Sequence, residues 1–215
     1  MVKWYIYGAG GLGVETMDIL MQMNAASGSQ DIQPVFMVDT PEAEEVAGLP
    51  VIGFNEAVPG SRVSIAVGEP ELRYELRNKA QRAGLTLSPA ISPSAFISPL
   101  AEIGDGAIIA PFCSIQARSS IGENVAVNTA AIVGHDVVVE TDTVLSSMVN
   151  LGGATKVGSR SYVGMGALTK EGLTIGHSTI VGMGSVVYTD VPDEVICVGN
   201  PARVSRRNTS KRVFK

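Results

Sequence analysis

The sequence predicts an α/β Rossmann-like domain over residues 1–91, followed by an all-β left-handed parallel β-helix over residues 92–215. Short apolar runs alternate with helical patterns in the first part, as in a small parallel sheet. From residue 97 onward, aliphatic residues recur at every sixth position. The 24 glycines, with only 5% aromatic residues, suit tight turns between closely packed strands.

The first domain begins with an apolar strand that enters a glycine turn, and its helices carry recognisable end signals. Pro70 stands in the first turn of an amphipathic pattern that Gly84 closes. The expected elements, in order, are a strand at 3–7, a helix at 13–23, strands at 34–39 and 62–68, a helix at 70–84 and a short strand at 85–91.

The second domain shows a hexad repeat. Fifteen of the sixteen residues at every sixth position from 97 to 187 are Ile, Val or Leu, and only Thr169 departs. Such a repeat is typical of a parallel β-helix, in which three hexads form one triangular coil and each coil rises by about 4.8 Å. We expect roughly five coils, about 25 Å in all. The N-terminal domain should cover one open end and the C-terminal segment the other.

Composition excludes several protein classes. A net charge of −5 gives no basic surface for nucleic acid, and every long uncharged stretch is broken by Gly, Ser, Pro or Asn, so no membrane span is expected. The start of the chain shows no signal-peptide pattern, which predicts a cytoplasmic protein. Cys113 and Cys197 fit no disulfide or metal framework, and we expect them to be small buried side chains.

One of the two histidines lies in the stretch "AIVGHDVVVE". In the hexad frame Val133 points inward, so His135 lies near a bend and can face outward. Asp136 follows directly, and a carboxylate beside an imidazole can fix its tautomer and raise its basicity, as a general base requires. A surface histidine without a role is the alternative.

Gly153 stands eighteen residues after His135 and should lie one coil above it. A glycine there leaves room for a reacting group and exposes a backbone N–H to a developing oxyanion. A tight bend would also explain this glycine. His177 has a different register and is followed by Ser, so we expect a surface residue.

The segments "VGMGAL" and "VGMGSV" are also eighteen residues apart. Met165 and Met183 should therefore stack along one edge, flanked by glycines. The resulting groove would suit a long, thin ligand such as the pantetheine arm of coenzyme A. Ordinary coil packing is the alternative.

These motifs resemble those of the left-handed β-helix acyltransferases. The resemblance rests on "NTAAIVGHD", "VGMGA", "VGMGS" and "ICVGNPARV", together with the N-terminal "YIYGAGGLG", "MVD" and "AVGEPELR". The N-terminal motifs narrow the resemblance to the bacterial nucleotide-amino-sugar N-acetyltransferases of glycan pathways and the related sialic-acid O-acetyltransferases. It covers roughly residues 2–204.

The resemblance implies roles for named residues. His135 would be the general base, Asp136 its support, and Gly153 the contact to the acetyl thioester, while backbone groups at Met165 and Met183 would hold coenzyme A. The N-terminal domain would hold the nucleotide, and the residues assigned to it are Gly10, Gly11, Leu12, Asp39, Gly68 and Glu69.

Two positions depart from the family pattern. Val144 stands where many members carry a second histidine that contacts the acetyl donor, which puts the binding of the thioester in doubt. Leu12 replaces a histidine common in the first glycine turn, which suggests a different nucleotide or sugar.

The predicted function is an acetyl-CoA-dependent N-acetyltransferase acting on a nucleotide-linked amino sugar, a UDP-linked 4-amino-4,6-dideoxy sugar being the expected type. O-acetylation of sialic acid or another sugar is the alternative, and a sugar-binding structural β-helix is the non-enzymatic one. We expect no metal, because a zinc hydratase of this architecture usually uses three histidines and this chain has two. We expect a homotrimer with active sites between subunits.

The chain ends in the basic segment "RVSRRNTSKRVFK". A solvated terminus is the simplest interpretation. Contact with the phosphates of coenzyme A or with a neighbouring subunit is the alternative.

Overall fold

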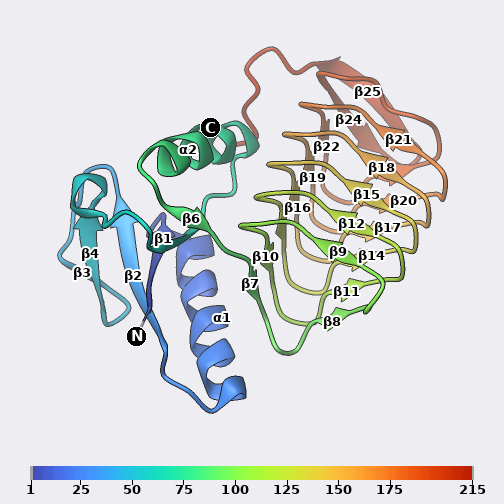
Figure 1. Cartoon of the computed structure of the whole chain (residues 1–215). Coiled ribbons are helices and arrows are strands. Elements are labelled where there is room, and N and C mark those ends of the chain that lie inside the picture. Colours follow the sequence, from blue (N-terminus) through green and yellow to red (C-terminus); the bar gives the residue numbers. More distant parts are fainter. Residues whose placement is uncertain (1, 215) are drawn as a thin grey trace.

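The computed structural model describes residues 2–214, and it confirms the predicted fold class: an α/β sheet with two helices, followed by a parallel β-solenoid (Figure 1). The elements of the first part are β1 (Val2–Tyr7), α1 (Gly11–Ser27), β2 (Ile32–Val38), β3 (Glu45–Val46), β4 (Leu49–Gly53), a short 3-10 turn (Phe54–Glu56), β5 (Arg62–Ile65), α2 (Pro70–Arg82) and β6 (Thr86–Leu87).

The N-terminal sheet has the strand order β3-β4-β2-β1-β5-β6, with β1 central and parallel to β2 and β5. Side chains of β1 alternate between its two faces. Trp4 and Ile6 pack with α1, whereas Tyr5 and Tyr7 pack with α2, so one helix covers each face. The hairpin of β3 and β4 was not predicted, because two-residue β3 is too short to show a period.

The helix ends follow the local sequence. α1 begins directly after the glycine turn and ends at Gly28, which adopts φ +66°. It extends beyond the predicted 13–23 because its last turns lie partly in solvent, where apolar spacing is no guide. α2 begins with Pro70 as predicted and ends at Arg82.

The solenoid has three faces of parallel strands. The β7 face consists of β7 (Ala90–Ile91), β10 (Ile108–Ile109), β13 (Ala126–Val127), β16 (Val144–Leu145), β19 (Tyr162–Val163) and β22 (Ile180–Val181). The β8 face consists of β8 (Phe96–Ile97), β11 (Ser114–Ile115), β14 (Ile132–Val133), β17 (Asn150–Leu151), β20 (Leu168–Thr169) and β23 (Val186–Val187). The β9 face consists of β9 (Glu102–Ile103), β12 (Ser120–Ile121), β15 (Val138–Val139), β18 (Lys156–Val157) and β21 (Thr174–Ile175).

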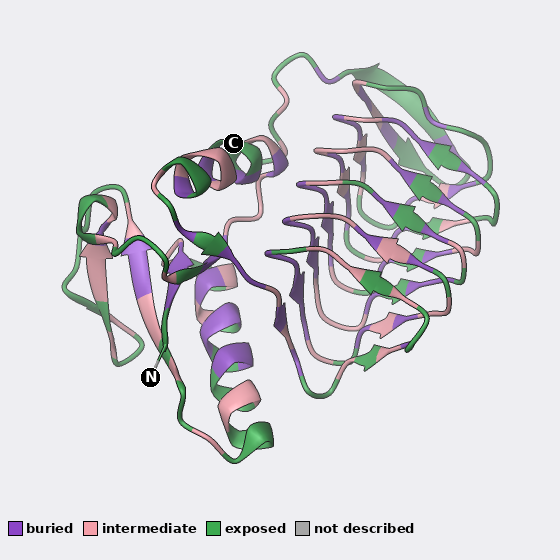
Figure 2. Cartoon of the chain, viewed as in Figure 1, coloured by how far each residue is buried: buried purple, intermediate pink, exposed green. Residues whose placement is uncertain are grey.

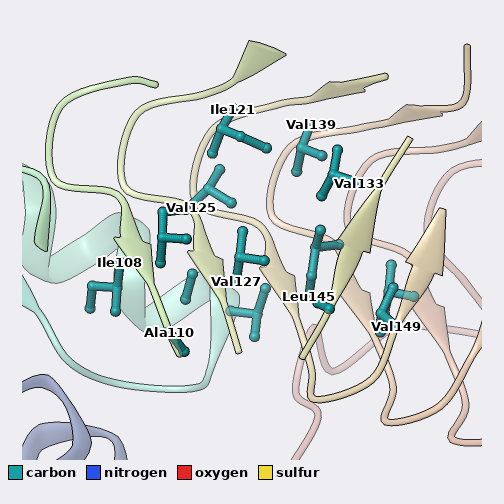
Figure 3. Close-up of a cluster of buried hydrophobic side chains, with 14 of the residues drawn as sticks. Ile108, Ala110, Ile121, Val125, Val127, Val133, Val139, Leu145 and Val149 are labelled. Atoms are coloured by element: carbon teal, nitrogen blue, oxygen red, sulfur yellow. The ribbon is translucent and has the colours of Figure 1, made fainter. Parts of the chain in front are cut away.

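The predicted register holds, since Val133 pairs with Leu151 and with Ile115, each eighteen residues away. The aliphatic residues of the hexads fill the interior (Figure 3), and most of them are buried. Figure 2 shows buried residues in each coil of the solenoid. A second inward row, two residues earlier in each hexad, was not predicted. It is built of small residues, including Cys113, Thr143 and Ser161, all buried.

The hydroxyl groups of this second row bond to backbone carbonyls of the next coil. Thr143 donates to Gly158 at 3.0 Å and Ser161 to Gly176 at 2.7 Å. Both cysteines are buried and unpaired, as expected, and burial raises the pKa of each thiol to about 11. The core is therefore apolar on its broad faces and hydrogen-bonded near its corners.

The N-terminal domain lies along the β7 face of the solenoid (Figure 1), so the expectation that it covers an open end is wrong. Ile108, Ala126 and Val144 point outward from this face, yet each is at most 1% exposed. The physical reason is that an aliphatic outer face can be buried only by another element, here the N-terminal domain.

Two arginines of α2 fix this contact. Arg73 is fully buried and donates to the carbonyl groups of Ile65 and Asn124. Burial lowers its pKa to about 10. Arg77 donates to both carboxylate oxygens of Asp142 at 2.9 Å. The two domains are thus joined by one buried arginine that bonds to carbonyl groups and by one partly buried arginine that is paired with Asp142, and both hold their relative orientation.

The C-terminal part adds β24 (Val195–Gly199) beside β22 and β25 (Ala202–Arg207) antiparallel to β24. The chain then leaves the solenoid and returns to the N-terminal domain, ending beside α2 (Figure 1). No helix between residues 2 and 214 has the length and apolar character that crossing a membrane requires.

Candidate active site

His135 lies at the corner where the chain turns from the β8 face to the β9 face. Asp136 adopts φ +60°, and this left-handed turn brings its carboxylate back toward the preceding imidazole. The Nδ1 atom of His135 lies 2.7 Å from Oδ2 of Asp136. The imidazole is 61% exposed, so its other nitrogen is open to a substrate.

Arg118 completes this arrangement from one coil below, and the sequence analysis missed it. Its guanidinium binds both carboxylate oxygens of Asp136, at 2.7 and 2.8 Å. Arg118 first, and His135 second, hold the pKa of Asp136 at about 2. Arg118 stands eighteen residues before Asp136, so the same register that located Gly153 would have revealed it.

The charge of Asp136 determines which imidazole nitrogen carries the hydrogen. An ionised carboxylate only accepts hydrogen bonds, so the Nδ1 of a neutral His135 must be the donor. The lone pair then resides on Nε2. This is the tautomer that a general base needs, because Nε2 is the nitrogen that faces away from Asp136.

Gly153 lies directly over the imidazole, as the eighteen-residue spacing predicts. A Cβ atom at this position would lie 2.6 Å from both Cε1 and Nε2 of His135. Its N–H donates no hydrogen bond within residues 2–214. The site therefore combines an accessible Nε2 with an unpaired backbone donor on the adjacent coil.

Thr169, the one residue in the sixth-position row that is not aliphatic, bonds to the glycine pair Gly152–Gly153. Its hydroxyl oxygen accepts a hydrogen bond of 2.9 Å from the N–H of Gly152. A Val or Ile could not accept that bond. The departure from the hexad pattern was visible in the sequence, but its contact depended on the structure.

Met165 and Met183 stack at the corner between the β7 and β8 faces, with the N–H of Gly184 bonded to the carbonyl of Met165 at 2.8 Å. The side chains are 45% and 74% exposed. Neither methionine N–H is paired among the described residues. Two unpaired backbone amides therefore stack at this corner, which is the opposite corner of the β8 face from His135.

The N-terminal domain contains a cavity of about 680 Å³ at the carboxyl ends of β1 and β5. Of the six residues predicted to bind nucleotide, the structure brings five together there. They are Gly10, Gly11, Leu12, Gly68 and Glu69. Four further lining residues come from the C-terminal segment, which sequence reasoning did not place here.

Asp39 is the sixth predicted nucleotide residue, and it does not line this cavity. Its carboxylate accepts hydrogen bonds from the Tyr7 hydroxyl and, at 2.8 Å, from Lys79 Nζ. Burial alone would raise the pKa of Asp39, but these two donors lower it overall.

Val144 is only 1% exposed, on the β7 face that the N-terminal domain covers. Its side chain has no accessible surface for a thioester bound to this chain, and it does not share the corner of His135. His177 lies at the third corner of the solenoid, between β21 and β22. Within the described part of the chain, no three His, Cys, Asp or Glu side chains are grouped as metal ligands would be.

This chain is similar to solved structures over nearly its whole length. A histidine variant of perosamine N-acetyltransferase from Caulobacter crescentus, bound to CoA and GDP-perosamine, is 32% identical, with a TM-score of 0.86 over 95% of this chain and 97% of that one. The acetyltransferase domain of PglB from Neisseria gonorrhoeae, in complex with acetyl coenzyme A, is 33% identical, with a TM-score of 0.85 over 94% and 98%.

This chain belongs to the left-handed β-helix acetyltransferases related to these nucleotide-amino-sugar N-acetyltransferases. WeeI from Acinetobacter baumannii also shares the fold of this acetyltransferase, at 29% identity and a TM-score of 0.86 over 95% of this chain and all of that one.

Curated sequences match a shorter part of this acetyltransferase, and no protein-family model matches it. A Saccharomyces cerevisiae protein that carries an acetyltransferase name is 36% identical over 55 residues, which span 28% of that protein.

Proposed function

We propose that this acetyltransferase transfers the acetyl group of acetyl-CoA to the amino group of a nucleotide-linked amino sugar, as a step of bacterial glycan biosynthesis. The observation that carries the proposal is the accessible Nε2 of His135 beneath Gly153, in a chain whose relatives bind CoA and GDP-perosamine. A UDP-linked 4-amino-4,6-dideoxy sugar is the first acceptor type to test.

The mechanism is direct transfer. The acceptor amine attacks the thioester carbonyl while Nε2 of His135 takes its proton, and Asp136 stabilises the imidazolium that forms. The carbonyl oxygen becomes an oxyanion that accepts a hydrogen bond from the N–H of Gly153. The C–S bond then breaks, and the thiolate of coenzyme A leaves with the proton from His135. No covalent enzyme intermediate is needed, because both substrates are held together.

The coenzyme would lie along the corner of Met165 and Met183, where unpaired backbone amides can bond to the amide groups of the pantetheine arm. His135 lies at the other corner of the β8 face. A thioester held at the methionine corner of one chain would therefore need the base of another chain.

A homotrimer supplies that second chain, with each active site between neighbouring subunits. Exposed apolar side chains on and beside the β8 face support such a contact. They are Phe96, Phe112, Ile132, Met148, Met165, Leu168 and Met183. Analytical ultracentrifugation tests this point, and an active monomer in dilute solution would contradict it.

The decisive experiment is a thiol-release assay with acetyl-CoA and a panel of UDP-, GDP- and dTDP-linked amino sugars. We expect thiol release with at least one of them, and mass spectrometry should locate the acetyl group on nitrogen. A parallel reaction with sialic acid as the acceptor tests O-acetylation. Thiol release with sialic acid but with none of the amino sugars would reject the N-acetyltransferase proposal. If none of the tested acceptors gives thiol release, both functions are rejected.

A further inference from the structure

The C-terminal segment Ser210–Phe214 forms one wall of the cavity in the N-terminal domain. It comes from the far end of the solenoid and runs back to α2 (Figure 1). Ser210, Lys211, Arg212 and Phe214 line the cavity together with the glycine turn before α1. The pocket is therefore built from both ends of the chain.

Specific contacts hold this segment in place. The carboxylate of Glu69 accepts hydrogen bonds from the backbone N–H of Val213, at 2.9 and 3.0 Å, and from that of Phe214 at 3.1 Å. The Phe214 ring meets Tyr162 edge to face, with centroids 5.7 Å apart. It also lies 3.5 Å from the point where a Cβ of Gly68 would stand.

An anchor upstream directs the segment. Asn208 is buried, its backbone N–H donates to the carbonyl of Glu194 at 2.7 Å, and its side-chain amide donates to that of Ser178 at 2.8 Å. With Asn208 fixed at one end and Glu69 at the other, the intervening residues have a defined course. A solvated terminus, the simplest expectation from the sequence, would show neither anchor.

The charges around the cavity differ between the N-terminal domain and the C-terminal segment. The N-terminal domain contributes three carboxylates to the lining, Glu69, Glu71 and Glu75, and no basic side chain. The only basic side chains of the lining are Lys211 and Arg212. A nucleotide diphosphate would be repelled by the carboxylates unless a cation faced it.

Lys211 already has a partner, since its Nζ lies 3.6 Å from Glu194. Arg212 forms no ion pair within residues 2–214. The N-terminus of α1 lines the same cavity, and it has no side-chain cap at Gly10 and no acidic residue in its first turn. Unpaired backbone N–H groups and a guanidinium together provide the donors that a diphosphate prefers.

We infer that Arg212 binds the diphosphate of the nucleotide-sugar substrate, and that Glu69 and Phe214 position it by fixing the C-terminal segment. This inference rests on the proposed function. It gives Glu69 an indirect role: the carboxylate holds the backbone of the segment, and the segment contacts the phosphates.

Isothermal titration of UDP, GDP and dTDP, each as a separate probe, tests the inference on the full-length protein. Arg212→Gln should weaken binding of the preferred diphosphate about tenfold, because a charged hydrogen bond is lost. Phe214→Ala should weaken it by a similar or smaller factor. The matched control Arg206→Gln removes the same charge from an exposed position of β25 and should change binding less than about twofold.

Kinetics provide the second measurement. Arg212→Gln should raise KM for the acceptor sugar and leave kcat and KM for acetyl-CoA unchanged. Unaltered diphosphate binding in Arg212→Gln would overturn the inference and leave the proposed function intact. Weakened CoA binding without weakened diphosphate binding would also overturn it, in favour of a coenzyme contact. A wild-type protein that binds none of the three diphosphates would overturn the inference and the nucleotide-sugar function together.

Discussion

The two histidines of this protein occupy the same place in their hexads, two residues after an inward aliphatic residue, and each pairs with an aspartate. They differ in the nitrogen that is used. His135 bonds to Asp136 through Nδ1. In His177 the nitrogen nearest the carboxylate is Nε2, which lies 3.2 Å from Oδ2 of Asp193, and its Nδ1 is buried without a hydrogen-bond partner between residues 2 and 214.

The residue on the next coil explains the difference. The N–H of Ala154 bonds to the carbonyl of His135, and the N–H of Glu194 bonds to that of His177 in the same way. Asp193 is therefore the counterpart of Gly153. A carboxylate above His177 occupies the outward nitrogen, whereas a glycine above His135 leaves Nε2 available. A His–Asp pair alone does not make a base, because the nitrogen facing solvent must also be unpaired.

Replacement of the imidazole should have the largest effect. We expect His135→Ala to lower kcat by about 10²–10⁴-fold, the usual contribution of a general base, with coenzyme A binding retained. His177→Ala is the matched control and should keep kcat within about twofold, because one of its ring nitrogens faces the carboxylate of Asp193 and the other is buried. Steady-state kinetics check both, and near-normal turnover of His135→Ala would remove the basis for the comparison.

A side chain above His135 should be nearly as harmful. Gly153→Ala places a Cβ 2.6 Å from the ring, so the imidazole must move, and we expect a loss in kcat of about 10²-fold. The double variant Gly153→Ala/His135→Ala tests whether the loss in kcat arises from the contact between the new Cβ and the imidazole. If Gly153→Ala lowers the residual rate of His135→Ala by the same factor, the contact between ring and glycine is not the cause.

Loss of the carboxylate should have a smaller effect than loss of the imidazole. Asp136→Asn no longer forces the hydrogen onto Nδ1, and we expect kcat to fall by about tenfold or more. The pKa of Asp136 is about 2, so the wild-type carboxylate is ionised throughout any practical assay range. The kcat/KM profile of the wild-type protein should therefore show no inflection from this residue above about pH 3. An inflection that disappears only in Asp136→Asn would show that the carboxylate titrates in that range.

The smallest effect should come from Arg118→Gln. Without the guanidinium, the pKa of Asp136 should rise from about 2 toward its ordinary 3.8, because the ionised form loses its main partner. The carboxylate stays charged at neutral pH, so kcat should fall by roughly threefold at most. Carbon NMR of the carboxylate measures the pKa directly. An unchanged pKa would mean that His135, and not Arg118, holds the carboxylate in its charged form.

The periodic contacts of this fold could be predicted with simple arithmetic. Gly153 over His135, and Met183 over Met165, follow from a step of eighteen residues, and Arg118 under Asp136 was available by the same step. The buried small-residue row was equally periodic but was missed, because it mixes Ser and Thr, which are mostly exposed in proteins, with Ala, Val and Cys. Val144 illustrates the opposite problem: its place on a strand was predictable, but what covers that strand was not.

The sequence by itself determined the solenoid, its register and the corner that carries the His–Asp pair, because in a coiled chain equal spacing in sequence becomes stacking in space. Only the tertiary structure decided which imidazole nitrogen is available, which face the N-terminal domain covers, and where the C-terminal segment ends. Those features arise from single, non-repeating contacts between distant parts of the chain, and no period encodes them.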